Sequence, residues 1–267
     1  MFRLFVRGAV IAALLGAATC ALAAGQSPQG FMVFDGLLYR NKPDLAPLGM
    51  PRILQINQPS GSADKLDEAS VRARLATLHD FTGALFLDYE DWPTSGVAAD
   101  VGARNIAFYN RVTEIAREMA PKATIGYYGE FPCRNYWGPV SGDHKKIADW
   151  KECNRRGEPV ASRVDVVYPS LYTFYNDQKS WDIYARAMIE EARRYRKPVY
   201  VFLWPEFHVS NPLLRNTEIP RQFWRHQLDF CRGLADGVVI WGGWNEEWRE
   251  DAPWWIETKA FLAANRH

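Results

Sequence analysis

The sequence lacks the signatures that several protein classes require. It contains no P-loop, no dinucleotide-binding glycine fingerprint and no HExxH-type metal pattern, so it implies neither a cofactor nor a metal. Basic and acidic residues nearly balance, at 32 against 31, and no long run carries one sign. This charge balance argues against nucleic acid as a partner. Internal repeats, low-complexity tracts and long linkers are also absent, which favours a single domain.

Long apolar runs are missing except at the N-terminus. Residues 1–24 combine Arg3 and Arg7 with an apolar stretch and a small-residue cleavage site, a pattern typical of a secretory signal peptide. The apolar stretch falls short of the ~20 residues that a membrane-spanning helix needs, so we expect no stable membrane anchor. The protein is therefore predicted to be secreted or periplasmic, with residues 25–267 as its mature domain.

Cysteines are few, four in all, and three of them follow the predicted signal peptide. Export makes a disulfide feasible. Cys133 and Cys153 flank one polar loop, which favours them as the pair. Closing a loop of about 20 residues stabilises a fold by ~3 kcal/mol in the chain-entropy model. Cys231 lies on a helical pattern and is expected to be a buried thiol.

Aromatic residues, in contrast, are abundant, with 11 tryptophans, 12 tyrosines and 14 phenylalanines. Short apolar runs alternate with amphipathic helical patterns along the whole chain, which predicts parallel strands joined by right-handed crossovers. Seven strands are predicted: Phe31–Phe34, Arg52–Ile56, Ala84–Asp88, Thr124–Tyr128, Val164–Tyr168, Val199–Leu203 and Gly237–Trp241. We therefore expect an α/β fold, a TIM-like (β/α) barrel formed by one domain.

Acidic and aromatic residues gather where the predicted strands end, which is where such barrels place their active sites. Asp88 and Glu90 follow one buried strand and point the same way, because side chains on a strand alternate between its faces. The other predicted strand ends carry Tyr128, Glu130, Tyr172, Trp204, Trp241 and Glu246. Carboxyl groups for proton transfer among rings that pack on sugar faces are what a carbohydrate site requires.

Four segments together resemble the hyaluronidases, a family of glycoside hydrolases. The run Asp88-Tyr89-Glu90-Asp91-Trp92-Pro93 resembles their D-x-E-x-W-x-P segment. Three further segments are similar to family segments and occur in the same order: Gly126–Cys133, Tyr168–Tyr172 and Gly237–Gly242. The resemblance implies a distorted barrel with seven strands, and it also implies a loop disulfide at Cys133 and Cys153.

The resemblance further implies cleavage of polysaccharides that contain N-acetylhexosamine, with retention, in which the substrate's own acetamido oxygen attacks C1. Glu90 would act as the acid and later as the base, with a pKa raised by the charge of Asp88 and by partial burial. Asp88 would accept a hydrogen bond from the acetamide N–H. Tyr128 and Tyr172 would position the acetamide, and Trp241 would contact its methyl group.

Two other interpretations of the same residues stay open. In one, Glu130 and Glu246 form the nucleophile and acid of a glycosidase that needs no acetamido group. In the other, the barrel binds carbohydrate without turning it over. In the acetamido-assisted mechanism, by contrast, Glu130 and Trp204 are expected to bind substrate. The expected partner is a polysaccharide or oligosaccharide with 2-acetamido sugars, and the expected state is a monomer.

Overall fold

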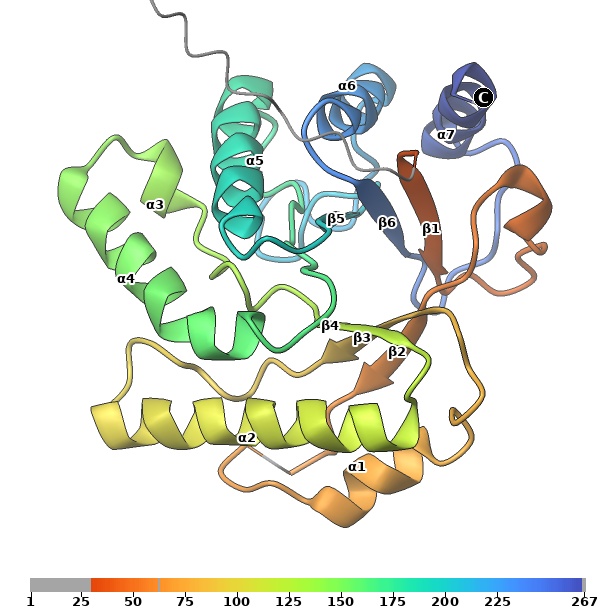
Figure 1. Cartoon of the computed structure of the whole chain (residues 1–267). Helices are drawn as coiled ribbons and strands as arrows, with labels where there is room; N and C mark the ends of the chain where they lie inside the picture. Colours follow the sequence, from red (N-terminus) through yellow and green to blue (C-terminus); the bar gives the residue numbers. More distant parts are fainter. Residues whose placement is uncertain (1–29, 62, 266–267) are drawn as a thin grey trace, which may run out of the picture.

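Two three-stranded parallel sheets form the centre of the fold (Figure 1). The computed structural model describes residues 30–61 and 63–265, so the predicted signal peptide lies outside the described residues. One sheet has the order β1-β6-β5 and the other the order β2-β3-β4. The strands are β1 Met32–Leu37, β2 Leu54–Asn57, β3 Ala84–Asp88, β4 Thr124–Tyr127, β5 Tyr200–Leu203 and β6 Gly237–Gly242.

The two sheets approach each other at two junctions through isolated bridges. At one junction, Asp35 of β1 pairs with Arg52 just before β2. At the other junction, Tyr168 pairs with Tyr128 and its neighbour Val167 pairs with Val199, so one short segment contacts both sheets.

The predicted strand at Val164–Tyr168 does not form a strand of either sheet, because this segment makes only those single bridges. Pro169 follows it and Pro198 lies opposite it, and proline has no N–H to donate to a ladder. Six strands in two sheets therefore take the place of the expected seven-stranded barrel within residues 30–61 and 63–265.

A glycine allows this segment to come close to β4. A Cβ atom on Gly126 would lie 2.3 Å from the carbonyl oxygen of Val166 and 2.8 Å from the ring of Tyr168. Any side chain at this position would force the segment away from the sheet. The glycine that belongs to one of the family-like motifs thus has a packing role here.

Helices cover the outer sides of both sheets (Figure 1). They are α1 Glu68–Leu75, α2 Ala99–Met119, α3 Trp137–Val140, α4 His144–Ala161, α5 Gln178–Arg193, α6 Arg221–Arg232 and α7 Pro253–Ala264, with a 3₁₀ turn at Ala46–Leu48. Three of them begin after an aspartate whose side chain accepts hydrogen bonds from N–H groups of the first turn: Asp67, Asp143 and Asp177. None of the helices in the described part of the chain is both long and apolar enough to cross a membrane.

The alternation of side chains along β3 divides the core. Leu85 and Leu87 belong to the apolar cluster that packs under α1 and α2. Phe86 points the other way, into a second cluster at the centre of the fold that also contains Phe202 and Val239. Asp88 has the parity of Phe86. Its carboxyl group therefore lies at the end of the central cluster rather than under the helices.

The cysteine predictions are confirmed. Cys133 and Cys153 form a disulfide, with their Cα atoms 6.2 Å apart. Cys231 is a free thiol that is completely buried on α6.

Candidate active site

An open cavity of about 260 Å³ lies beyond the C-terminal ends of β3, β4, β5 and β6. It is lined by Phe86, Asp88, Glu90, Tyr128, Arg134, Tyr172, Phe202, Trp204, His208, Val209 and Trp241. The structure thus brings together both predicted catalytic carboxyl groups and four of the five predicted substrate-binding residues. The exception is Glu130, which does not line this cavity.

The residues of the acidic motif divide between the cavity and the core. Asp88 and Glu90 line the cavity, whereas Tyr89 and Trp92 are fully buried beneath α2. The hydroxyl of Tyr109, on α2, donates a hydrogen bond to the carbonyl oxygen of Tyr89 at 2.9 Å. The two aromatic residues of the motif therefore anchor the chain between its two acids.

Asp88 is held by a residue from the neighbouring strand. Parallel pairing of β2 with β3 places Asn57 opposite Asp88, and Gln55 lies two residues earlier on β2. The amide nitrogen of Gln55 donates to Oδ2 of Asp88 at 2.6 Å and to Oδ1 of Asn57 at 2.7 Å. Burial, followed by the nearby charge of Glu90, raises the pKa of Asp88 to about 6, although Gln55 and Arg134 oppose this shift.

Glu90 forms an ion pair with Arg134, which follows the disulfide cysteine Cys133. The Arg134 guanidinium also lies 5.8 Å from the centre of the Tyr128 ring, in cation–π geometry. The side chains of Glu90 and Arg134 are 41% and 29% exposed, so solvent reaches this pair. Asp88 is the more buried of the two acids, and burial is the largest cause of its raised pKa.

Aromatic rings form the opposite wall of the cavity. The rings of Tyr172 and Trp241 are stacked with centroids 5.9 Å apart, and Trp204 stands nearly perpendicular to Trp241 at 5.3 Å. Tyr128 lies 5.8 Å from Tyr172. His208 completes this side, and burial, followed by the charge of Arg134, lowers its pKa.

Glu130 and Glu246, the alternative carboxylate pair, are not among the residues that line the cavity, although the charges of Arg134, Glu90 and Asp88 act on Glu130. Glu130 is half-buried and contacts the Tyr109 hydroxyl, and burial raises its pKa to about 8. Glu246 is exposed and adds its charge to that of Glu218 beside the buried Glu206. Neither carboxyl group lines the cavity that contains Asp88.

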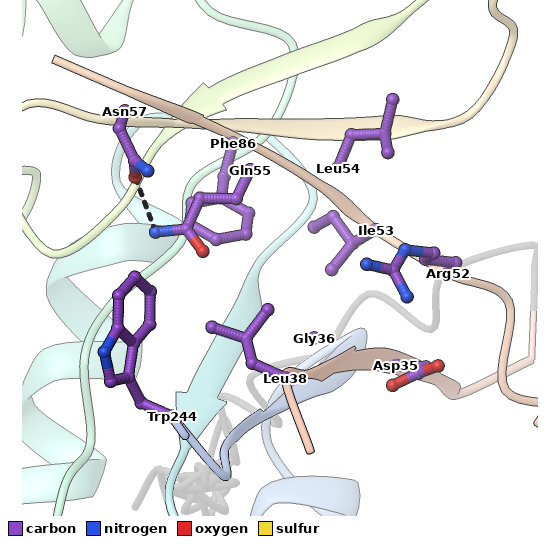
Figure 2. Close-up of a pocket in the computed structure, with 10 residues that line it drawn as sticks. All are labelled: Asp35, Gly36, Leu38, Arg52, Ile53, Leu54, Gln55, Asn57, Phe86 and Trp244. Carbon is purple, nitrogen blue, oxygen red and sulfur yellow. Dashed lines mark hydrogen bonds between the residues drawn. The ribbon is translucent and has the colours of Figure 1, made fainter. Parts of the chain in front are cut away.

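A second cavity of about 260 Å³ adjoins the first, since Phe86 lines both (Figure 2). It opens where β1 and β2 separate, and Trp244 is among its lining residues. The dashed line in Figure 2 marks the hydrogen bond from Gln55 to Asn57. Gln55 thus connects this cavity with Asp88.

Sequence reasoning missed Gln55 and Arg134. Gln55 and Asn57 point to the same side of β2, because side chains alternate along a strand. Parallel pairing of β2 with β3 would therefore have predicted that Gln55 lies near Asp88. Arg134 carries no comparable signal, because only the path of the disulfide loop brings it to Glu90.

Comparisons with known proteins show similarity at the level of structure alone. No protein-family model matches the sequence, and no curated protein matches it. The crystal structure of bee venom hyaluronidase matches with a TM-score of 0.64 and 17% identity, over 88% of this chain and 95% of that chain. The complex of that enzyme with a hyaluronic acid tetramer matches with a TM-score of 0.60 and 16% identity, over the same shares.

An endo-β-1,4-mannanase double mutant from Cellulomonas fimi also matches, with a TM-score of 0.50 and 13% identity, over 82% of this chain and 55% of that chain. At these identities the similarity shows a shared fold. The chain is thus a mixed α/β protein with parallel sheets whose structural neighbours are TIM-barrel proteins.

Proposed function

We propose that this protein is a glycoside hydrolase that cleaves polysaccharides containing N-acetylhexosamine by an acetamido-assisted, retaining mechanism. The observation that carries the proposal is one cavity in which Asp88 and Glu90 face the rings of Tyr128, Tyr172 and Trp241. The similarity of the fold to bee venom hyaluronidase supports it.

The acid pair supplies one proton and one negative charge. The charge of Glu90 acts on Asp88 and helps to raise its pKa, so a single proton can be shared between the two carboxyl groups. When a substrate acetamide N–H approaches Asp88, it favours the ionised form of that carboxyl, and the proton moves to Glu90. Glu90 then donates it to the leaving glycosidic oxygen while the acetamido oxygen attacks C1.

The second half of the reaction reverses these roles. Glu90, now ionised, removes a proton from a water molecule that attacks C1, and the cyclic intermediate opens with net retention. Asp88 remains hydrogen-bonded to the acetamide N–H and stabilises the positive charge that this group gains. Gln55 acts as a positioning residue, because its amide holds Oδ2 of Asp88 and leaves the other oxygen free to face Glu90 or substrate.

In the site without substrate, Arg134 holds Glu90 in an ion pair. A protonated carboxyl cannot form an ion pair, so Glu90 must leave Arg134 before it takes up the proton. The partial exposure of both side chains keeps this exchange inexpensive in free energy, since exposed ion pairs contribute only about 0–1 kcal/mol. Substrate entry is proposed to displace Arg134 from Glu90.

The aromatic wall orients the sugar. The hydroxyl groups of Tyr128 and Tyr172 would position the acetamide, and Trp241 would contact its methyl group. Trp204 stands against Trp241 and would pack on the sugar ring. We assign no substrate contact to Glu130, since it lies outside this cavity.

The same proposal extends to the family, location and assembly of the whole protein. The chain is proposed to be a distant hyaluronidase-like enzyme, secreted or periplasmic, that acts as a monomer with a single catalytic domain over residues 25–267. The segment around Val167 is proposed to occupy the place of a seventh barrel strand, supported by its bridges to both sheets.

Hydrolysis of matched substrates with and without a 2-acetamido group tests the mechanism. The proposal predicts reducing ends only from the acetamido substrate, with retention at C1, and inhibition by the thiazoline analogue of the intermediate. Equal cleavage of both substrates would indicate a two-carboxylate glycosidase. Binding of both substrates without release of reducing ends would indicate a carbohydrate-binding protein.

A further inference from the structure

A row of aromatic rings leads out of the cavity to the surface. His208 lines the cavity, and its ring lies 4.9 Å from that of Phe174. Phe174 lies 5.5 Å from Tyr136, which in turn lies 5.2 Å from both Tyr175 and Trp137. The row therefore connects the cavity to two rings at the surface.

The two outermost rings are exposed although they touch each other. Trp137 is 50% exposed and Tyr175 is 39% exposed, with ring centroids 5.5 Å apart. The indole N–H of Trp137 and the hydroxyl of Tyr175 belong to these exposed rings and can bond to a ligand. Trp137 and Tyr175 thus form an aromatic platform with polar groups at its edges.

The backbone that carries Trp137 is tied to its neighbours. Asn135 accepts a hydrogen bond from the N–H of Gly138 at 2.9 Å, which fixes the start of α3. The indole of Trp150 donates to the carbonyl oxygen of Cys133 at 2.9 Å, beside the disulfide. A Cβ on Gly138 would lie 2.8 Å from that of Trp150, so this helix is packed closely against α4. A backbone tied in this way loses little entropy when a ligand binds.

The size and chemistry of the platform favour a saccharide over a protein. A stable protein interface buries roughly 800 Å² on each partner, far more than two neighbouring rings provide. A sugar offers apolar C–H faces for the rings and hydroxyl groups for the N–H and O–H. The row passes through Tyr136, which is buried, but its successive ring contacts place the platform only three ring-to-ring steps from His208, a span that a long oligosaccharide can bridge over the surface.

We propose that Trp137 and Tyr175 form a second saccharide-binding position for the part of the substrate chain that extends beyond the cavity. This inference rests on the proposed function. It predicts that long oligosaccharides bind more tightly than short ones, and that the gain comes from these two rings.

Calorimetric titration of the mature chain tests this inference, in a Glu90→Gln background that prevents turnover. The probes are N-acetylglucosamine oligomers and hyaluronan oligomers, each as a short form that fills only the cavity and a form of six or more residues. Replacing both rings, Trp137→Ala with Tyr175→Ala, should weaken the binding of the long probes about 5- to 20-fold. Binding of the short probes should stay within about twofold.

Two control variants separate a direct contact from a structural effect. Tyr175→Phe keeps the ring and should retain most of the affinity. Ile256→Ala removes an equally exposed apolar residue from α7 and should change nothing. If the double variant binds short and long probes with wild-type affinity, the platform is not a binding position. The same conclusion follows if the variant loses affinity for short and long probes equally. In both cases the cavity still binds sugar. If no probe binds even before the rings are replaced, the proposed function itself is wrong, and this inference is overturned with it.

Discussion

Two clusters of acidic side chains lie near strand ends in this fold, and they differ in what surrounds them. The first contains Asp88 and Glu90, at the end of β3. The second contains Glu206, Glu218 and Glu246. Burial is the largest cause of a raised pKa in both clusters, which reaches about 6 for Asp88 and about 7 for Glu206.

Access and proton partners distinguish the two clusters. Asp88 has a donor in Gln55 and a carboxyl neighbour with which to share a proton, and it faces a cavity with aromatic walls. Glu206 is only 5% exposed, lies close to Tyr39, and lines neither of the two cavities described above. A raised pKa is therefore a poor guide by itself, since burial produces it with or without a place for a substrate.

Replacing the acids of the two clusters should produce the largest contrast. Glu90→Gln should lower turnover of natural glycans by about 10²–10⁴-fold, because an amide cannot donate a proton to a poor leaving group. A substrate with an activated leaving group should rescue Glu90→Gln in part. It should not rescue Asp88→Asn, since the acetamide must be oriented whichever group departs.

The matched control for these variants is Glu206→Gln, measured by the same reducing-sugar assay. It should keep turnover within about threefold of wild type, because Glu206 is not among the residues that line the cavity. A loss as large as that of Glu90→Gln would mean that the second cluster takes part in the reaction.

Removing the disulfide should have the next largest effect. The double variant Cys133→Ser with Cys153→Ser should lower the free energy of unfolding by ~3 kcal/mol, because the bond closes a loop with a sequence separation of 20. Denaturant titration of both proteins measures this difference. A reductant should destabilise wild type to the same extent and leave the variant unchanged, so a further loss in the variant would contradict this explanation.

The pH dependence of the free energy of unfolding should distinguish the buried Glu206 from the exposed Glu247. The pKa of Glu206 is raised from 4.5 to about 7, so the folded state binds more protons than the unfolded state, and Glu206 lowers stability as pH rises through this range. Glu206→Gln should therefore raise the free energy of unfolding at pH 8 by about 2 kcal/mol, or roughly 4–8 °C in Tm, with little gain at pH 4. Glu247→Gln, at an exposed ion pair with Arg40, should change Tm at neither pH. Equal gains of Glu206→Gln at both pH values would rule out ionisation as the cause.

Removing the donor to Asp88 should give the smallest effect, on the pH profile. The hydrogen bond from Gln55 lowers the pKa of Asp88, so Gln55→Leu should raise that pKa above about 6. Because the pair must keep the proton that Glu90 donates, and a raised pKa keeps that proton bound to higher pH, the alkaline limb of kcat against pH should move to higher pH. At the optimum, kcat should fall by about tenfold with little change in KM. A uniform loss of rate with an unshifted alkaline limb would show that Gln55 acts only on folding.

The local features of this protein could be predicted from neighbouring residues. The apolar run before Asp88 predicts a strand, and the observed bounds Ala84–Asp88 match it. Two cysteines flanking one polar loop sufficed to predict the disulfide. These features depend on side-chain alternation and on short chain separations, both of which can be read from neighbouring residues.

The distant groups that meet the acid pair could not be predicted in this way, because long-range packing brings them there. Gln55 is 33 residues from Asp88, and Arg134 is 44 residues from Glu90. Strand register brings the first to its partner, and the path of the disulfide loop brings the second. The pKa shift followed the same rule, because burial depends on the packing around each carboxyl and not on its place in the motif. The periodicity of a strand determines the direction of a side chain, whereas its partners depend on how separate strands and loops pack together.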